Sequence, residues 1–424
     1  MNISIVGVGY VGVVTGACFA EFGNKVICVD INKKKVELIN SGKSPIYEPG
    51  LDALLKKHIG KNLSATTDIN KAIQISDLIF ICVGTPSLPD GSTDLKYIKS
   101  AAKDIATALK QKNTYSVIVV KSTVPPKTTE SLISIIEQES GKSCGKDFGI
   151  AMNPEFLPEG RALEDFMNPD RTVIGSIDKK SYESVLSLYK SFKTPIIHVD
   201  LRTAEMIKYT SNAFLATKIS FANEIGNICK PLGLDVYEIM NAVGMDKRIG
   251  RLFLNAGIGY GGSCFKKDLN SLIHTAKNNN IEPKILKSVN ETNDCQPHKI
   301  VELAKKKLGS LEGKKITVLG LAFKPDSDDM REAPSILVIN VLLSEGALVT
   351  AYDPIAMENA KKIFNNKINF SSTLEAALSV NKIIFILTEW KEFKKESLYY
   401  EKIVFDGRKV LNGKSRDNYE GVCW

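Results

Sequence analysis

The segment MNISIVGVGYVGVVTGACFAEFGNKVICVD, residues 1–30, decides the fold. It contains an apolar run, a glycine-rich turn, a longer run of helical character and a second short apolar run. Gly7, Gly9 and Gly12 have the G-x-G-x-x-G spacing: the first permits a tight turn, the second lets backbone approach a pyrophosphate, and the third lets helix and strand pack closely. A helix that starts there points its amino terminus at the phosphates. The segment therefore predicts a dinucleotide site, and the alternative is a tight turn without a ligand.

The carboxylate of Asp30 ends the second apolar run. At this position a carboxylate accepts hydrogen bonds from ribose hydroxyls and repels a 2′-phosphate, so the sequence favours NAD over NADP. The lysines at 33–35 weaken this preference slightly. We expect Lys35, with Tyr10 and Val11 of the turn, to contact the cofactor.

Two threonines follow later predicted strands: Thr85, between Gly84 and Pro86, and Thr123, between Ser122 and Val124. Ligands of doubly wound sheets bind outside the carboxyl ends of the strands, so we expect both to line the cofactor groove. Taken alone, each is explained equally well as a capping or turn residue.

Alternation of short apolar runs with amphipathic segments predicts an α/β fold with two Rossmann-like, doubly wound parallel-sheet domains. The first block has strand candidates ISIVGVG, KVICVD, LIFICVG, SVIVVKST, FGIAMNP and TVIG. The second has KKITVLGLAF, ALVTAYDP, KIIFIL and KIVFDG, with an incomplete glycine set in its first turn. Between them, a long helix over about 203–230 predicts a central helical domain. We expect domains at 1–200, 201–310 and 311–424, and little structure after about Asn412.

Composition excludes several classes of protein. The chain has 424 residues and a net charge of +8, but its lysines are spread out, which argues against a nucleic-acid binder. Apolar runs are too short for a membrane span, and the N-terminus has no basic leader of a signal peptide, so we expect a cytoplasmic protein. The eight cysteines show no metal-ligand spacing and are expected to be reduced thiols. No metal site is predicted.

Cys264 has a setting unlike that of the other cysteines. Residues 257–268 read GIGYGGSCFKKD, and a helical pattern follows. A cysteine at a helix N-terminus, beside Lys266 and Lys267, favours the thiolate. Asp268 lies one helical turn on and shares a face with Cys264. The alternative is a capping loop with a packing cysteine; no histidine is obviously paired with Cys264, so a Cys/His hydrolase is poorly supported.

A dinucleotide site and a reactive thiol together suggest one chemistry. A thiolate adds to an aldehyde to give a thiohemiacetal, loss of a hydride to NAD gives a thioester, and water releases an acid. A lysine or asparagine that stabilises the oxyanion would assist each step.

The chain resembles the UDP-glucose/GDP-mannose dehydrogenase family over nearly its whole length. The strings that carry the resemblance are GVGYVG, VGTPS, KSTVPP, NPEFLPEG, EMIKYTSNAFLATKISFANE, GMDKRIG, GYGGSCFKKD, LAFKPDSDDMRE and FDGR, in that order. The resemblance implies oxidation of a nucleotide-sugar hydroxymethyl group to a carboxylate with two NAD. FDGR favours UDP-glucose as the substrate, and the alternatives are GDP-mannose or a UDP-N-acetylhexosamine. A dehydrogenase that stops after one oxidation and a non-catalytic dinucleotide sensor remain further alternatives.

The resemblance also implies roles for residues of this sequence. Cys264 matches the covalent nucleophile, and Lys208, Asn212, Asp268, Thr123 and Glu155 match its catalytic partners. Glu159, Lys267 and Arg331 match cofactor contacts. The substrate contacts are Glu155, Phe156, Leu157, Glu159, Lys208, Asn212, Asn255, Tyr260, Gly261, Lys324 and Arg408. Arg248 matches a residue that reaches the neighbouring subunit's substrate, which implies a homodimer. Each residue taken alone is also explained as a surface or capping residue. Lys266 departs from many relatives at its position.

Overall fold

The computed structural model describes residues 1–412 and 417–424, which form two compact units. The first unit is Met1–Ser211 with Asn270–Thr275, and the second is Asn212–Leu269 with Ala276–Trp424. Helix α9 (Leu201–Cys229) passes from the first unit into the second.

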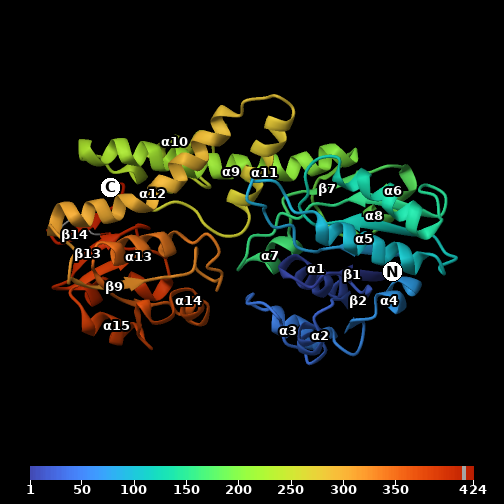
Figure 1. Ribbon diagram of the computed structural model, residues 1–424, viewed down its shortest axis with the longest axis horizontal. Helices are drawn as coiled ribbons and strands as arrows, with labels where there is room; N and C mark the ends of the chain where they lie inside the picture. Colours follow the sequence, from blue (N-terminus) through green and yellow to red (C-terminus); the bar gives the residue numbers. More distant parts are fainter. Residues whose placement is uncertain (413–416) are drawn as a thin grey trace. The chain divides into compact units, whose positions relative to one another are not determined.

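An eight-stranded sheet forms the centre of the first unit (Figure 1). Its order is β3-β2-β1-β4-β5-β6-β7-β8, and every neighbouring pair is parallel except β6 and β7. The order reverses between β1 and β4, which is where a doubly wound sheet binds its ligand. The strands are β1 (Asn2–Val6), β2 (Lys25–Val29), β3 (Leu63–Thr66), β4 (Leu78–Ile81), β5 (Ser116–Val120), β6 (Phe148–Met152), β7 (Thr172–Ser176) and β8 (Ile196–Val199).

Helices cover both faces of this sheet, which explains why its strands read as continuous apolar runs. In β4, Leu78 and Phe80 belong to the core on one face, whereas Ile79 and Ile81 belong to the core on the other. The helices are α1 (Tyr10–Glu21), α2 (Lys33–Asn40), α3 (Leu51–His58), α4 (Ile69–Ile75), α5 (Lys96–Leu109), α6 (Thr128–Ser140), α7 (Ala162–Met167) and α8 (Lys179–Leu186), with a 3-10 turn at Ser187–Tyr189.

The second unit contains a parallel six-stranded sheet of order β11-β10-β9-β12-β13-β14. Its strands are β9 (Lys315–Leu319), β10 (Leu348–Tyr352), β11 (Asn369–Phe370), β12 (Ile383–Ile386), β13 (Ile403–Asp406) and β14 (Tyr419–Gly421). Its helices are α13 (Pro334–Ser344), α14 (Met357–Phe364) and α15 (Leu374–Val380), with 3-10 turns at Asn365–Lys367, Lys391–Lys394 and Glu396–Tyr399.

The C-terminal tail corrects one expectation. Little structure was expected after about Asn412, but β14 pairs in parallel with β13, and Cys423 is fully buried. Three residues are too few to be recognised as a strand, and their stability comes from pairing and burial. Residues 413–416 of the expected tail lie outside the described residues.

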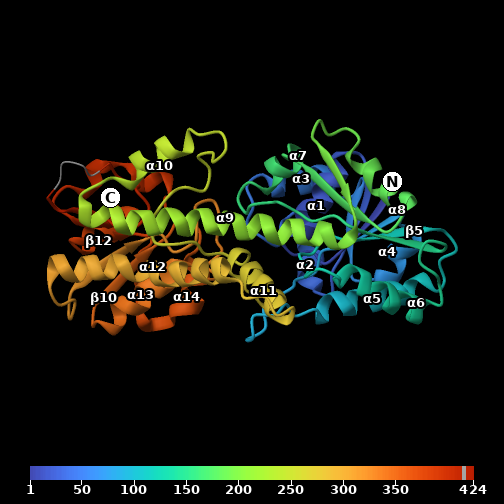
Figure 2. The same cartoon turned by 90° about the horizontal axis from the view of Figure 1, so that it is seen from above.

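Three further helices follow α9 in the chain, and one of them carries the segment Asn270–Thr275 that belongs to the first unit. They are α10 (Val236–Gly244), α11 (Phe265–Asn278) and α12 (Lys284–Leu308), and a 3-10 turn (Lys230–Leu232) follows α9 before Gly233. Figure 2 shows α12 alongside α9, where Ser220 Oγ donates to Val289 O at 3.0 Å and Asn227 Nδ2 donates to Gln296 Oε1 at 2.9 Å.

The predicted fold class is confirmed: two Rossmann-like sheets and a long helix in a helical region between them in the chain. The three-domain division stays a prediction. Across the described ranges 1–412 and 417–424, no helix has both the length and the apolar character needed to cross a bilayer.

Candidate active site

The turn after β1 has the geometry that its three glycines predict. Gly7 has φ +95°, and a Cβ there would lie 2.9 Å from Cys82 O. A Cβ on Gly12 would lie only 1.9 Å from Gly7 O, so the α1 backbone can approach the turn only without a side chain. A Cβ on Gly9 would meet nothing within 4 Å. The space at Gly9, at the N-terminus of α1, fits the pyrophosphate of a dinucleotide.

Asp30 lies beside this turn. Its Oδ2 accepts a hydrogen bond from Val8 N at 2.9 Å, and its Oδ1 accepts one from Asn32 N at 2.9 Å. Lys35 Nζ lies 3.8 Å from Asp30 Oδ2, so the two predicted cofactor residues form an ion pair. A fixed carboxylate at this place is suited to the ribose hydroxyls of NAD. Tyr10 and Val11, the first residues of α1, pack against the core under the turn.

The loops that follow β4 and β5 lie side by side, next to the point where the strand order reverses. Thr85 Oγ1 donates to Thr123 O at 2.8 Å, and Ser122 Oγ donates to Val83 O at 2.7 Å. Side chains therefore hold the two loops together, and the predicted pair Thr85 and Thr123 is adjacent.

Glu155 and Lys208 form a buried ion pair. Their exposed fractions are 7% and 4%, and Lys208 Nζ lies 3.0 Å from Glu155 Oε1. Leu157 N donates to Glu155 Oε2 at 2.6 Å. Burial acts to raise the pKa of Glu155, but the charge of Lys208 and the Leu157 amide outweigh it, so the pKa is lowered. Lys208 Nζ also lies 5.4 Å from the ring centroid of Phe156. The loop carrying Phe156 and Leu157 is thus joined to α9, while Glu159 in the same loop is only partly buried.

Beneath this loop lies a second buried lysine that the sequence did not single out. Lys121 Nζ donates to Asn153 Oδ1 at 3.0 Å, and Tyr189 Oη donates to the same oxygen at 2.6 Å. Burial lowers the pKa of Lys121 to about 8. Lys121 is the first residue of the KSTVPP string and Asn153 is the first residue of the NPEFLPEG string, so their hydrogen bond joins the two strings.

In the second unit, Asp268 joins two of its predicted partners. Asn212 Nδ2 donates to Asp268 Oδ2 at 2.6 Å, and Lys267 Nζ donates to Asp268 Oδ1 at 2.5 Å. Asp268 is only 1% exposed, and its amide donates to Cys264 O at 2.9 Å in the first turn of α11. Cys264 is the N-cap residue of α11 and is exposed, as its sequence setting predicts. The helix dipole at this position favours the thiolate.

The glycine loop before Cys264 is held by carboxamides that the sequence did not reveal. Asn293 on α12 accepts a hydrogen bond from Tyr260 N at 2.8 Å and donates one to Tyr260 O at 3.1 Å. Gly257 N donates to Asn223 Oδ1 at 2.8 Å, and Gln296 Nε2 donates to Gly257 O at 2.7 Å. Buried amides of this kind fix one backbone path for the loop.

Several predicted substrate residues lie along the same loop. Gly262 N donates to Arg331 O at 2.8 Å, and a Cβ on Gly261 would lie 2.9 Å from Phe323 Cβ, next to Lys324. A Cβ on Gly257 would lie 3.5 Å from an Arg408 guanidinium nitrogen. The guanidinium group of Arg331 itself pairs with Asp329.

Two predicted substrate residues lie apart from this group. Asn255 Oδ1 accepts a hydrogen bond from Arg251 Nη2 at 2.7 Å, and Arg248 pairs with Asp246. The Arg248 side chain is 88% exposed. Within residues 1–412 and 417–424, neither side chain is hydrogen-bonded to another predicted site residue.

The second sheet has a counterpart of Asp30 whose carboxylate accepts hydrogen bonds from groups of the protein itself. Asp353 follows β10 and is 1% exposed. Its carboxylate accepts hydrogen bonds from Leu321 N, Ala322 N and Trp390 Nε1, among other donors. A carboxylate saturated in this way has little capacity left for ribose hydroxyls, so this unit is not built as a second site for NAD.

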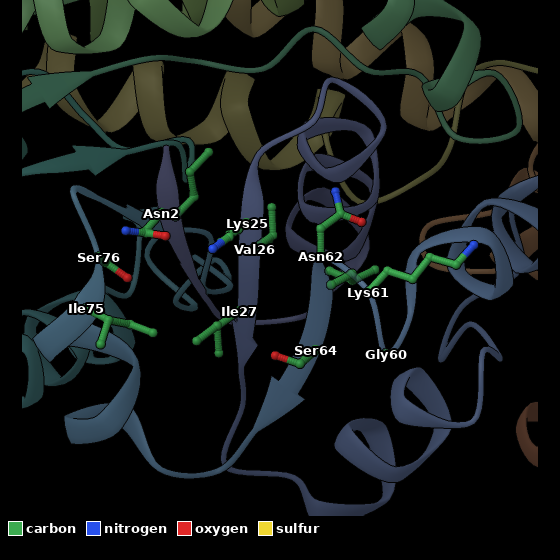
Figure 3. A pocket seen from close by; sticks show the side chains of 12 residues that line it. Asn2, Lys25, Val26, Ile27, Gly60, Lys61, Asn62, Ser64, Ile75 and Ser76 are labelled. Atoms are coloured by element: carbon green, nitrogen blue, oxygen red, sulfur yellow. The ribbon is translucent and has the colours of Figure 1, made fainter.

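Of two hollows in the structure, the first lies away from the predicted site and the second borders the glycine loop. One of about 280 Å³ is at the amino ends of β1 to β3 (Figure 3), at the opposite edge of the sheet from Gly9. The other, of about 550 Å³ in the second unit, is lined by Tyr260, Lys266, Asn293 and residues of α13. In the described part of the chain, no three His, Cys, Asp or Glu side chains are grouped to hold a metal ion.

Comparison with known proteins agrees with these features. Residues 1–193, 202–295 and 317–413 match the NAD-binding, central and UDP-binding domains of the UDP-glucose/GDP-mannose dehydrogenase family. The chain is 45% identical to the UDP-glucose 6-dehydrogenase TuaD of Bacillus subtilis, over 97% of this chain and 90% of that protein. It is 41% identical to the UDP-glucose 6-dehydrogenase AglM of Haloferax volcanii, over 100% of both chains.

Solved structures give the same result. The fold matches a UDP-glucose dehydrogenase of the hyperthermophilic archaeon Pyrobaculum islandicum with a TM-score of 0.95 and 42% identity, over 100% of this chain and 97% of that one. The predictions of NAD as cofactor and of a dehydrogenase are thereby confirmed. With three consecutive domain matches and relatives above 40% identity over the full chain, this protein belongs to the UDP-glucose/GDP-mannose dehydrogenase family.

Proposed function

We propose that the protein is a UDP-glucose 6-dehydrogenase that oxidises the sugar's 6-hydroxymethyl group to a carboxylate in two steps. The observation that carries the proposal is the position of Cys264 at the N-cap of α11, one turn before an Asp268 fixed by Asn212 and Lys267. A thiol so placed is needed for oxidation beyond the aldehyde and has no use in a simple alcohol dehydrogenase.

The relatives support UDP-glucose over the other nucleotide sugars. Those that share 41% to 45% identity with the chain are named UDP-glucose 6-dehydrogenases. A GDP-mannose dehydrogenase structure shares 37% identity and a UDP-D-ManNAc dehydrogenase structure shares 28%. The FDGR string, whose Arg408 lies along the glycine loop, agrees with this choice.

The proposed chemistry assigns a bond change to each step. NAD, when bound, supplies the hydride acceptor for both oxidations. The alcohol first loses a hydride from its carbon and a proton from its oxygen to become the aldehyde. The Cys264 thiolate then bonds to the aldehyde carbon while the carbonyl oxygen takes a proton, and the adduct loses a hydride and a proton to become a thioester. Water next attacks the thioester, the carbon–sulfur bond breaks, and Sγ leaves as thiolate. The balance is one alcohol, two NAD and one water giving one carboxylate, two NADH and three protons.

Polar side chains are proposed to stabilise the charges that develop. Asn212 is held by Asp268 and is suited to donate to the substrate oxygen, and Lys208 carries the positive charge that a developing oxyanion needs. Glu155, whose pKa is lowered, is a carboxylate near neutral pH and can accept a proton from a hydrolytic water. Thr123 is proposed to help hold that water.

The remaining site residues are proposed as binding contacts. Glu159, Lys267 and Arg331 contact the cofactor. Phe156, Leu157, Asn255, Tyr260, Gly261, Lys324 and Arg408 form the substrate wall. This division follows the family strings in which the residues lie.

We propose a homodimer in which Arg248 reaches the neighbouring subunit's substrate. In the second unit, Phe214, Phe221 and Ile228 are spaced by seven residues along α9 and are 64%, 52% and 53% exposed. Such a stripe on one helix face is suited to a second copy of the same helix. Met245, in the same exposed segment as Arg248, adds a further exposed apolar side chain.

We also propose the domain division 1–200, 201–310 and 311–424. In this division the middle domain contains both the proposed dimer contact and the nucleophile.

A cytoplasmic location is also proposed. The chemistry requires a reduced Cys264, and none of the eight cysteines, all within the described part, is in a disulfide.

The test is NADH release from a panel of UDP-glucose, GDP-mannose and UDP-N-acetylglucosamine. Release with UDP-glucose alone, at two NADH per sugar, is expected. Release only with another sugar would reassign the substrate, and one NADH per sugar would favour a dehydrogenase that stops after one oxidation.

A further inference from the structure

Glu48 is a buried carboxylate that the proposed chemistry does not use. It lies in the loop between α2 and α3 and is 7% exposed. Gly160 N donates to Glu48 Oε2 at 2.7 Å, and Ala162 N donates to Oε1 at 2.8 Å. The Tyr10 hydroxyl also donates to Oε2 and accepts a hydrogen bond from Gly160 N at 2.9 Å. Tyr10, Glu48 and Gly160 therefore close a ring of hydrogen bonds.

This ring joins two segments that both have binding roles in the proposed function. Tyr10 is the first residue of α1 and directly follows Gly9, where space is open for the pyrophosphate. Gly160 directly follows Glu159 and closes the loop that begins at Glu155. One carboxylate from a third segment thus fixes the cofactor turn against the substrate loop.

The chemistry of the contacts requires a carboxylate. The Tyr10 hydroxyl and the amides of Gly160 and Ala162 are all donors, and an ionised carboxylate only accepts. Hydrogen bonds to a charged acceptor are about twice as strong as those between neutral groups. A glutamine at position 48 would have nearly the same shape. Its side-chain NH2 group is a donor, however, and would face one of these donors in place of a carboxylate oxygen.

We propose that Glu48 is a positioning residue that couples the dinucleotide turn to the segment 155–160, so that the affinities for NAD and for the nucleotide sugar both depend on it. The roles of this segment rest on the proposed function. The competing explanation is that Glu48 only caps the short helix α7, in which case its loss lowers stability without changing affinity.

The test uses Glu48→Gln and Tyr10→Phe, with Glu164→Gln as the matched control. Glu164 is a carboxylate on α7 whose side chain is 68% exposed and pairs with Arg161 at the surface. Calorimetry measures the Kd for NAD alone and for UDP-glucose alone, neither of which requires turnover. We expect Glu48→Gln to weaken both by about tenfold. Tyr10→Phe is expected to weaken NAD by about threefold, whereas Glu164→Gln should leave both within twofold of the unmodified protein.

Steady-state kinetics provide a second readout, since a positioning role raises KM more than it lowers kcat. The proposal is overturned if Glu48→Gln binds both ligands within twofold while its Tm falls, which is the behaviour of a lost helix cap. If Glu48→Gln does not fold, unchanged NAD affinity in Tyr10→Phe overturns it instead. If the unmodified protein oxidises no nucleotide sugar but Glu48→Gln still weakens the binding of both NAD and UDP-glucose, the proposed function fails and the coupling stands.

Discussion

Lys208 Nζ lies 3.0 Å from Glu155 Oε1, and fewer than one-tenth of either side chain is exposed. Removing one member of such a pair leaves an uncompensated buried charge, so Glu155→Gln is expected to cost about 3 to 5 kcal/mol of unfolding free energy. We also expect kcat to fall at least ~100-fold, because the proton acceptor is lost. Urea denaturation and NADH release measure the two effects.

The control is the double variant Glu155→Leu with Lys208→Met. Replacing both charges by apolar groups removes the uncompensated charge, so stability should return close to that of the unmodified protein while activity stays absent. Recovery of activity in the double variant would show that the pair is structural only.

The glycine loop gives a second prediction. Asn293→Asp keeps the acceptor for Tyr260 N but loses the Nδ2 donor to Tyr260 O, so the loop should shift from its path. We expect about a tenfold loss of kcat and slower alkylation of Cys264 by iodoacetamide. Glu291→Gln, an exposed change on the same helix, should alter neither. Unchanged alkylation in Asn293→Asp would mean that the loop does not need this contact.

Lys121 predicts a pH dependence of stability. Burial lowers its pKa from 10.5 to about 8. Below pH 8 the folded protein holds a buried ammonium, and above pH 10.5 both folded and unfolded chains have the neutral amine. Between these values the unfolded chain binds more protons, so the free energy of unfolding should rise with pH, by a contribution of order 3 kcal/mol.

Lys121→Met should remove this contribution. The difference in unfolding free energy between the unmodified protein and the variant, measured by urea denaturation from pH 7 to 11, isolates it from other titrations. A difference that stays flat across pH 8 to 10.5 would show that the pKa of Lys121 is not lowered in the folded protein.

The parts of the fold and of the site that are formed by residues close together in the chain could be predicted from the sequence. The strand, three glycines and helix at residues 3–21 are close in the chain. Gly7 and Gly12 are needed for close contacts within that unit or with the adjacent strand, and Gly9 leaves open space beside the turn. Likewise, four glycines and a helical pattern were enough to place Cys264 at the start of α11.

Contacts between distant segments were not predictable in this way. Glu48 and Gly160 are 112 residues apart in the chain, and Asn293 and Tyr260 are 33 apart. A lone carboxylate or carboxamide in the sequence looks the same whether it holds a loop or faces water. Strand β14 was missed for the same reason, because three residues become a strand only by pairing with β13.

The dimer proposal predicts complementation between two inactive variants. Cys264→Ala lacks the nucleophile, and Arg248→Ala lacks the residue proposed to serve the partner's site. When the two are unfolded together and refolded in equal amounts, half of the dimers are mixed, and each mixed dimer has one complete site. Activity should return to about a quarter of the unmodified level. No recovery, with mixed dimers present by native mass spectrometry, would contradict an Arg248 that acts across the interface.

The sulfur of Cys264 is the centre of the proposed chemistry, and acid quench during turnover tests it directly. With UDP-glucose and NAD, the Glu155→Gln variant should accumulate a thioester on the peptide that contains Cys264, which adds the mass of the nucleotide-sugar acid less one water. Cys264→Ala should give no adduct and no acid, while its affinity for NAD persists. Formation of acid by Cys264→Ala at the normal rate, at two NADH per sugar, would contradict the account.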